Sequence, residues 1–313
     1  MANVLKTIKN LKPEEKINIF FRRNIFGTQN LFRYFLFNKI FKLLFTNRGC
    51  SFKNLPKEGF IRLNRINEKV INKINNEIKN QNIESKNASI NFKVDDKLNK
   101  IFRELINENL KNDLNNLRQV YNFNFVISNI EIKRNFFFEK KNLEFKNVYS
   151  ENYHEDKYIC TQIKQFIYLS NVEKDNGPFS FFKIKDSRKF VKENKLENRF
   201  NFKIQQFKGN NISNEFFFLG KPGDTLLVDT SELLHRANIP SRGNYRDMLT
   251  ITYNLTHDKK YNDVWSIVDN NVNFWKEKDQ LNYSKKFSKP AGYYYLVLVF
   301  LKFLFLKINF IKY

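Results

Sequence analysis

GKPGDTLLVDTSELLH, the stretch at residues 220–235, carries the clearest fold signal in the sequence. Pro222 and Gly223 are typical of a turn, and the apolar run after them predicts a short strand that delivers His235 at its far end. Runs of β-branched and aromatic residues recur on both sides of this stretch, with turns between them. The strands that they predict cover residues 125–133, 161–169, 179–184, 216–219, 225–228 and 248–255.

Helical patterns come before these strands. Residues 67–79 place Val70, Ile71, Ile74 and Ile78 at helical spacing, and residues 101–120 carry a second apolar stripe. Helices followed by many short strands are typical of a mainly β fold of the α+β kind. We therefore expect a double-stranded β-helix, a cupin-like jelly roll, buttressed by helices on one side.

The chain of 313 residues is long enough for one enlarged domain with extensions at both ends. We expect the double-stranded β-helix to cover residues 55–260, after a basic and aromatic helical extension at residues 1–54. A C-terminal extension at residues 261–313 ends in an apolar-basic segment. Within the domain, the Asn- and Lys-rich residues 189–211 are interpreted as a long insertion or loop.

The formal net charge of +23 would ordinarily indicate nucleic acid or an anionic membrane as a partner. The lysines are scattered along the chain, however, and no nucleic-acid-binding motif is present, so we do not expect nucleic acid as the partner. The basic-aromatic stretches at residues 17–45 and 293–313 contain too many charges to span a bilayer. Helices packed on the flank of the domain are one interpretation, and peripheral attachment to a membrane surface is the other.

The two cysteines, Cys50 and Cys160, match no metal-binding or redox spacing, so a disulfide framework is not expected. A cytoplasmic location is therefore the default prediction. Membrane association at the inner face is its alternative.

His154 is one of only three histidines and lies in the segment YHEDKY, residues 153–158. In an extended segment, residues two apart project to the same face, so His154 and Asp156 can offer an imidazole nitrogen and a carboxylate oxygen to one ion. Such a triplet alone is weak support for a metal site.

His235, at the end of a predicted strand, strengthens the case. Two histidines and one carboxylate on a β scaffold form the facial triad that suits Fe(II) and leaves three positions for a bidentate co-substrate and dioxygen. Arg246 follows His235 by eleven residues and begins the next predicted strand. Its guanidinium could bind the distal carboxylate of 2-oxoglutarate. Arg236 and Arg242 are its rivals for this role.

These residues belong to a pattern that resembles the phytanoyl-CoA dioxygenase-like family. The segments that carry the resemblance are His154, FIYL at residues 166–169, NGPF at residues 176–179, PGD at residues 222–224, HRA at residues 235–237 and Arg246. The resemblance implies hydroxylation of an unactivated carbon by an enzyme that uses Fe(II) as its cofactor. Such an enzyme consumes 2-oxoglutarate and O2 and releases succinate and CO2. It also implies that His154, Asp156 and His235 hold the iron and that Arg246 anchors 2-oxoglutarate.

These residues do not specify the substrate, and we expect a small molecule, a lipid or a glycan. A negatively charged substrate would be compatible with the positive net charge of the chain. Two other functions stay open. A cupin-like metal enzyme that does not use 2-oxoglutarate would need no arginine at position 246. A basic protein that binds nucleic acid or membrane through a degenerate barrel would take up no iron.

Overall fold

The structure, a computed structural model, describes residues 49–81, 88–121, 124–139, 153–154, 156, 162–193 and 214–256. The stretches at residues 17–45 and 293–313 lie outside this range, as does Cys160. The boundaries of the two terminal extensions therefore stay predictions. Within the described ranges, no helix combines the length and the apolar character that a bilayer span requires.

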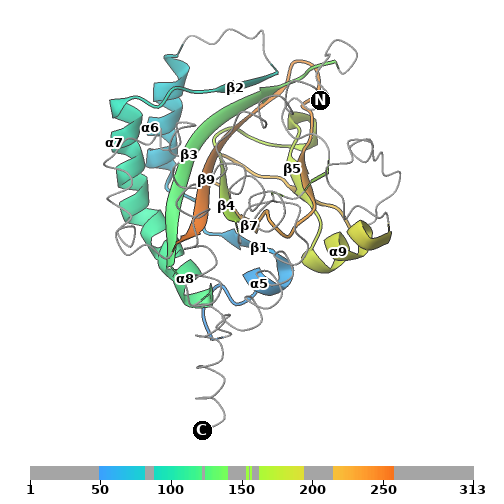
Figure 1. Cartoon of the computed structure of the whole chain (residues 1–313). Coiled ribbons are helices and arrows are strands. Elements are labelled where there is room, and N and C mark those ends of the chain that lie inside the picture. Colours follow the sequence, from blue (N-terminus) through green and yellow to red (C-terminus); the bar gives the residue numbers. More distant parts are fainter. Residues whose placement is uncertain are drawn as a thin grey trace, which may run out of the picture. The chain divides into compact units, whose positions relative to one another are not determined.

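Two antiparallel sheets form the body of the described part (Figure 1). The larger sheet has six strands in the order β1 (Phe60–Leu63), β7 (Thr225–Asp229), β4 (Gln162–Tyr168), β9 (Tyr245–Thr256), β3 (Asn124–Phe136) and β2 (Ser89–Asn91). The smaller sheet has the order β6 (Phe216–Phe218), β5 (Phe179–Phe181) and β8 (His235–Ala237). An antiparallel bridge between His154 and His235 adds a further short segment beside β8.

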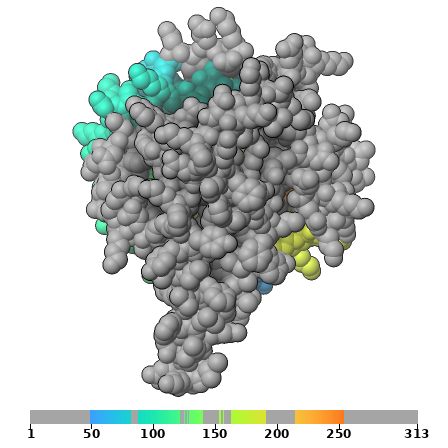
Figure 2. All heavy atoms as spheres, viewed as in Figure 1, coloured from blue at the N-terminus to red at the C-terminus, as the bar shows by residue number. Residues whose placement is uncertain are grey.

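Helices cover one face of the larger sheet. Figure 1 shows α6 (Glu68–Lys79), α7 (Asp96–Leu105) and α8 (Lys111–Tyr121) on the side of β3 that faces away from β5. Elsewhere the short α5 (Leu55–Glu58) precedes β1, and the 3-10 turn η4 (Lys174–Asn176) precedes β5. Side chains of α9 (Ile184–Glu193) reach the surface in the space-filling view (Figure 2).

The core between the two sheets is apolar and aromatic. Phe166 and Tyr168 of β4 pack there with Phe179 and Phe181 of β5. Further members come from β6, β7, the start of α9 and the connecting segments, namely Val172, Ile184, Phe218, Leu226, Val228 and Leu233. This cluster holds the small sheet against the β7 and β4 side of the large sheet.

The helix predicted at residues 67–79 is confirmed as α6, and Asn67 caps it by accepting a hydrogen bond from the backbone of Lys69 at 2.9 Å. The helix predicted at residues 101–120 is interrupted, because five residues form a π-helical turn, η2 (Ile106–Leu110), between α7 and α8. The strand predicted at residues 179–184 ends at Phe181. Residue 184 begins α9, so the first part of the predicted insertion at residues 189–211 is helical. Its residues 194–211 lie outside the described range.

A polar network lies between α8 and the helix-facing side of the large sheet. Gln165 of β4 donates a hydrogen bond to Asp113 of α8 at 2.9 Å, and Tyr253 of β9 donates one to Gln165 at 2.5 Å. Burial raises the pKa of Asp113 from 3.8 to about 6, and the hydrogen bond from Gln165 offsets only part of this rise. The charged form of Asp113 is therefore disfavoured in the folded protein.

We expect Asp113→Asn to stabilise the protein at pH 8 by about 1–3 kcal/mol, because asparagine keeps the acceptor for Gln165 and carries no charge. The folded protein binds the Asp113 proton more tightly than the unfolded chain does, so the cost of ionisation grows as the pH rises from about 4 to about 6 and is complete above that. Below pH 4 the two proteins should unfold alike in urea. Equal stabilisation at both pH values would show that charge is not the cause.

Candidate metal centre

A tight turn after β7 carries the chain from the large sheet into the small one. The backbone nitrogens of Glu232 and Leu233 both donate to the carbonyl of Asp229 at 3.1 Å, and the Ser231 hydroxyl donates to the Asp229 carboxylate at 2.6 Å. All four side chains are buried. This fixed turn places His235 at the start of β8. The sequence predicted His235 at the far end of the preceding strand, but that strand, β7, ends at Asp229 and the turn separates it from His235.

The segment with His154 and Asp156 is tied to this turn by three backbone hydrogen bonds. The backbone nitrogen of His154 donates to the carbonyl of His235 at 2.9 Å, and the reverse bond measures 2.8 Å. The backbone nitrogen of Asp156 donates to the carbonyl of Thr230 at 2.7 Å. The predicted alternation is present, since both side chains approach the ring of His235.

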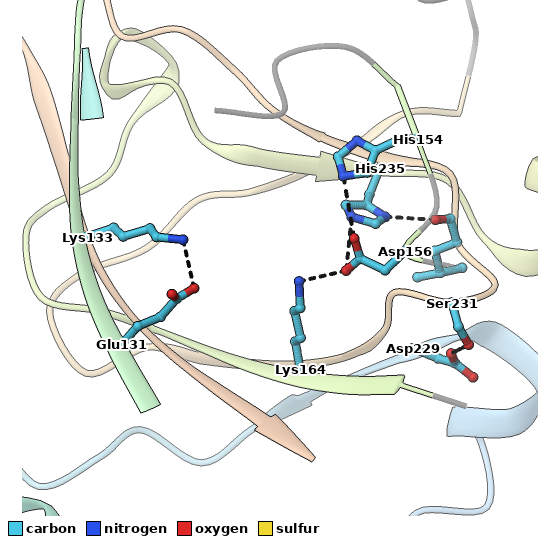
Figure 3. Close-up of polar contacts among 9 residues, drawn as sticks. Glu131, Lys133, His154, Asp156, Lys164, Asp229, Ser231 and His235 are labelled. Carbon is cyan, nitrogen blue, oxygen red and sulfur yellow. Dashed lines mark hydrogen bonds and ion pairs between the residues drawn. The ribbon is translucent and has the colours of Figure 1, made fainter. Parts of the chain in front are cut away.

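Potential ligand atoms of His154, Asp156 and His235 all lie within 4.8 Å of one another. Asp156 Oδ1 is 3.7 Å from His154 Nε2, and Asp156 Oδ2 is 3.9 Å from His235 Nε2 (Figure 3). Three ligands on one face of an octahedron, each about 2.1 Å from the ion, would lie roughly 3 Å apart. A small inward movement of the side chains would therefore let the three residues hold a metal ion.

The hydrogen bonding of His235 also suits metal binding. Its Nδ1 lies 2.8 Å from the carbonyl of Leu233, so this nitrogen carries the proton and donates. Nε2 then keeps its lone pair and faces Asp156. An orienting bond of this kind on the second nitrogen is the usual arrangement for a histidine that binds a metal.

The charge states favour a cation at this place. Burial alone would raise the pKa of Asp156, but the charges of Lys164, His235 and His154 outweigh it and lower that pKa well below its ordinary value. Burial, together with the charge of His154, lowers the pKa of His235 from 6.5 to about 3. The carboxylate is thus ionised and this imidazole neutral near pH 7, which are the forms that bind metals.

Lys164 is a site residue that sequence reasoning missed. Its Nζ forms an ion pair with Asp156 Oδ2 at 2.6 Å (Figure 3). The signal for it was the two-residue period of β4, in which Lys164 shares a face with Phe166 and Tyr168. A metal ion would replace this ammonium as the partner of Asp156. Lys164 would then favour an anionic ligand beside the ion.

Arg246 lies near the start of β9 with only 1% of its surface exposed. It shares a face of the sheet with Met248, which packs against the core between the sheets. Its charge also acts on the buried hydroxyl of Tyr168, where burial raises the pKa and Arg246 partly opposes the rise. Tyr168 in turn lies 3.4 Å from the backbone nitrogen of Phe179, whose ring is 5.5 Å from the His235 ring. Arg246 therefore belongs to the same interior, beyond these aromatic rings.

The two rival arginines lie elsewhere. The side chain of Arg242 is 78% exposed and pairs with Glu139. Arg236 pairs with Glu215 through two hydrogen bonds of 3.1 and 3.2 Å. Of the three arginines, only Arg246 combines burial with a position on the core-facing side of the large sheet.

Arg236 connects the two segments that carry the histidines, because it follows His235 and contacts Tyr153, which precedes His154. Its guanidinium lies 4.2 Å from the centre of the Tyr153 ring, and burial together with a hydrogen bond to Glu215 raises the pKa of Tyr153. Tyr153 precedes His154, and Arg236 follows His235. This clamp of Tyr153, Glu215 and Arg236 therefore fixes the register in which the two histidines meet.

We expect Arg236→Met to weaken Fe(II) binding about tenfold, in the range measured when residues behind metal ligands are changed. Arg236→Lys keeps a cation over Tyr153 and should recover part of the affinity. Arg242→Met, an exposed arginine, is the matched control. Anaerobic Fe(II) titration together with thermal unfolding would test the clamp. A fall in unfolding temperature with unchanged Fe(II) affinity would limit the clamp to a role in stability.

No family model matches the chain, and no curated protein matches it. Among solved structures, the chain is similar to the non-heme alpha ketoglutarate dependent epimerase SnoN from nogalamycin biosynthesis, with 12% identity over 64% of this chain and 79% of that one and a TM-score of 0.42. HygX from Streptomyces hygroscopicus, solved with iron bound, shares 15% identity over 65% and 84% of the two chains, with a TM-score of 0.43. AviO1 from Streptomyces viridochromogenes Tue57 shares 13% identity over 66% and 95%, with a TM-score of 0.43. Similarity at these identities and TM-scores does not establish a shared function, so the function has to follow from the chain's own residues.

Proposed function

We propose that this protein is an Fe(II)- and 2-oxoglutarate-dependent dioxygenase that hydroxylates its substrate. The observation that carries the proposal is the meeting of His154, Asp156 and His235, whose ligand atoms lie within 4.8 Å of one another. Two neutral imidazoles and a carboxylate on one face of an ion are the ligand set of non-haem Fe(II) oxygenases.

The arrangement of strands supports a double-stranded β-helix as the finer description of the fold. One four-stranded sheet would be β3-β9-β4-β7, and the other would be the His154 segment with β8, β5 and β6. All pairings between these elements are antiparallel. Such a barrel has room for a co-substrate between its sheets. On this proposal the two additional strands, β1 and β2, extend the larger sheet.

The positions of the side chains assign a role in the proposed reaction to each residue of the site. Bound Fe(II) would supply the redox chemistry that turns a C–H bond, 2-oxoglutarate and O2 into an alcohol, succinate and CO2. His154, Asp156 and His235 would hold the ion and leave three positions open. Arg246 would bind the distal carboxylate of 2-oxoglutarate from the buried end of the interior. The aromatic rings around Phe179 would exclude water from the space between them.

Lys164 supports the choice of an anionic co-substrate. Its ammonium lies within the metal site, and placing a divalent cation beside it is unfavourable unless an anion binds there as well. 2-Oxoglutarate carries two carboxylates and so supplies this anion. A cupin-like enzyme that works without 2-oxoglutarate would have no use for two buried or half-buried cations, Lys164 and Arg246, around one metal.

Membership of the phytanoyl-CoA dioxygenase-like family is part of the proposal and rests on the segments from His154 to Arg246. Attachment to a membrane surface through residues 17–45 and 293–313 is likewise a proposal from the sequence. Flotation of the full chain with anionic vesicles, compared with a chain that ends at residue 292, would test it.

Formation of succinate without an added substrate is the test of the proposed reaction, because these enzymes turn over 2-oxoglutarate slowly on their own. Purified protein with Fe(II), 2-oxoglutarate and air should produce succinate, and the His235→Ala protein should not. Folded, iron-loaded protein that produces none would contradict the proposal.

A further inference from the structure

The register of the large sheet turns a polar strip of β3 towards the interior. Pairing across β9 places Asn129 in line with Thr252 and Lys164. One row further, Glu131 lies in line with Thr250 and Phe166. In the next row Lys133 lies in line with Met248 and Tyr168. Residues in one row share a face, so the polar strip of Asn129, Glu131 and Lys133 faces the same side as Lys164 and the core.

The polar strip differs from the β4 and β7 part of this face. That part is covered by the apolar cluster that joins the two sheets, and none of the described β3 side chains belongs to that cluster. Lys133 Nζ pairs with Glu131 Oε1 at 2.9 Å, with 36% and 30% of the two side chains exposed. Figure 3 shows both side chains projecting from β3 towards the side where Lys164 and Asp156 lie.

Stability alone does not explain the charges of the strip. A partly exposed ion pair contributes little to stability, because water screens the two charges, whereas apolar side chains at the same positions would add buried apolar surface. A few polar groups on the wall of an otherwise apolar interior are instead typical of ligand sites, where they fix the orientation of the ligand. The strip therefore fits a binding role.

The spacing of the strands gives the size of the ligand. Neighbouring strands lie about 4.8 Å apart, and β9 separates β3 from β4, so the strip runs roughly 10 Å from the β4 strand that carries Lys164. Lys164 contacts the metal ligand Asp156 directly. A molecule with its reacting carbon at the metal and its charged end at Glu131 and Lys133 would be about the size of an amino acid or somewhat larger.

We propose that Glu131 and Lys133 bind the substrate, and that this substrate is a small zwitterion with an ammonium and a carboxylate close together. This inference rests on the proposed dioxygenase function. The ammonium would pair with Glu131 and the carboxylate with Lys133. A purely anionic ligand would be attracted by Lys133 but repelled by the Glu131 carboxylate, which lies only 2.9 Å from the Lys133 ammonium. A purely cationic ligand would be attracted by Glu131 but repelled by Lys133. A ligand with both charges can pair with both residues at once.

The experiment measures how added compounds stimulate succinate formation by the full chain with Fe(II) and 2-oxoglutarate. The probes are the common free amino acids, and each active one is repeated as its N-acetyl and methyl ester derivative. We expect at least one free amino acid to stimulate turnover, and both derivatives of it to fail, because each lacks one charge. Stimulation only by uncharged or purely anionic compounds, or by none of the probes, would overturn the proposal.

Variants locate the effect. Glu131→Gln and Lys133→Met should each raise the concentration for half-maximal stimulation about tenfold or more, the loss expected for one hydrogen bond to a charged partner. Glu77→Gln removes one partner of the ion pair between Glu77 of α6 and Lys97 and should behave as the wild type. Unchanged stimulation of the two strip variants would contradict the assignment. If the wild type forms no succinate under any condition, the dioxygenase function itself fails, which is a different result.

Discussion

Fe(II) binding is expected to be lost when His154, Asp156 or His235 is replaced by alanine. Each change removes one of three protein bonds to the ion, so the affinity should fall by more than the ten- to hundred-fold that is typical of residues behind the ligands. The fold should persist, because the turn at Asp229 and the backbone bridge between the histidine segments do not depend on these side chains. Turnover of 2-oxoglutarate should disappear with the metal.

Anaerobic titration with Fe(II) measures this effect, and circular dichroism shows whether each variant is folded. Asp96→Ala, a change at an exposed carboxylate in the first turn of α7, is the control and should bind Fe(II) like the wild type. If any one of the three triad variants kept wild-type affinity, that residue would not be a ligand.

Arg246→Ala should raise the KM for 2-oxoglutarate about ten- to a hundred-fold while Fe(II) affinity changes little. The guanidinium would otherwise bind a carboxylate inside a water-poor interior, where a hydrogen bond to a charged partner contributes roughly 1.5–3 kcal/mol. Arg246→Lys should recover only part of this, because an ammonium cannot present two parallel donors. Steady-state succinate formation at varied 2-oxoglutarate gives the KM.

Arg242→Ala, an arginine with 78% of its side chain exposed, is the control for this measurement. Because Arg246 is buried, thermal unfolding and Fe(II) affinity must be measured on the same preparations. An unchanged KM in folded Arg246→Ala protein, or a larger rise in Arg242→Ala, would show that the co-substrate carboxylate binds elsewhere.

The sequence allowed the three candidate metal ligands to be proposed because their signals are local. The i and i+2 spacing of His154 and Asp156 places both on one face of an extended segment, and the turn before β7 predicts the strand that leads to His235. The backbone bridge that brings the two histidines together joins segments that are distant in the sequence, and no local pattern indicates it.

Other features could not be predicted because they depend on packing between distant segments. Strands β2 and β8 have three residues each, which is too short for a period to be recognised. The clamp of Tyr153, Glu215 and Arg236 joins three segments that are far apart in the sequence. The π-helical turn inside residues 101–120 leaves the apolar stripe intact, so periodicity alone predicted one continuous helix.

Lys164 is an intermediate case. The alternation in β4 shows that Lys164 lies on the same face as Phe166 and Tyr168. The sequence does not show that Lys164 pairs with Asp156. The same reasoning applies to Glu131 and Lys133, whose alternation in β3 gains a meaning only from the register with β9 and β4. Register therefore supplied what the sequence could not.

The central claim is that His154, Asp156 and His235 hold Fe(II) with 2-oxoglutarate bound to it. The most direct test is the visible absorption spectrum of the protein with Fe(II) under strictly anaerobic conditions, recorded while 2-oxoglutarate is added. Chelation of Fe(II) by the 2-oxo acid produces a weak charge-transfer band, and we expect this band to rise to saturation in the wild type and to be absent in His235→Ala. A folded wild-type protein that binds Fe(II) and shows no band at saturating 2-oxoglutarate would contradict the claim.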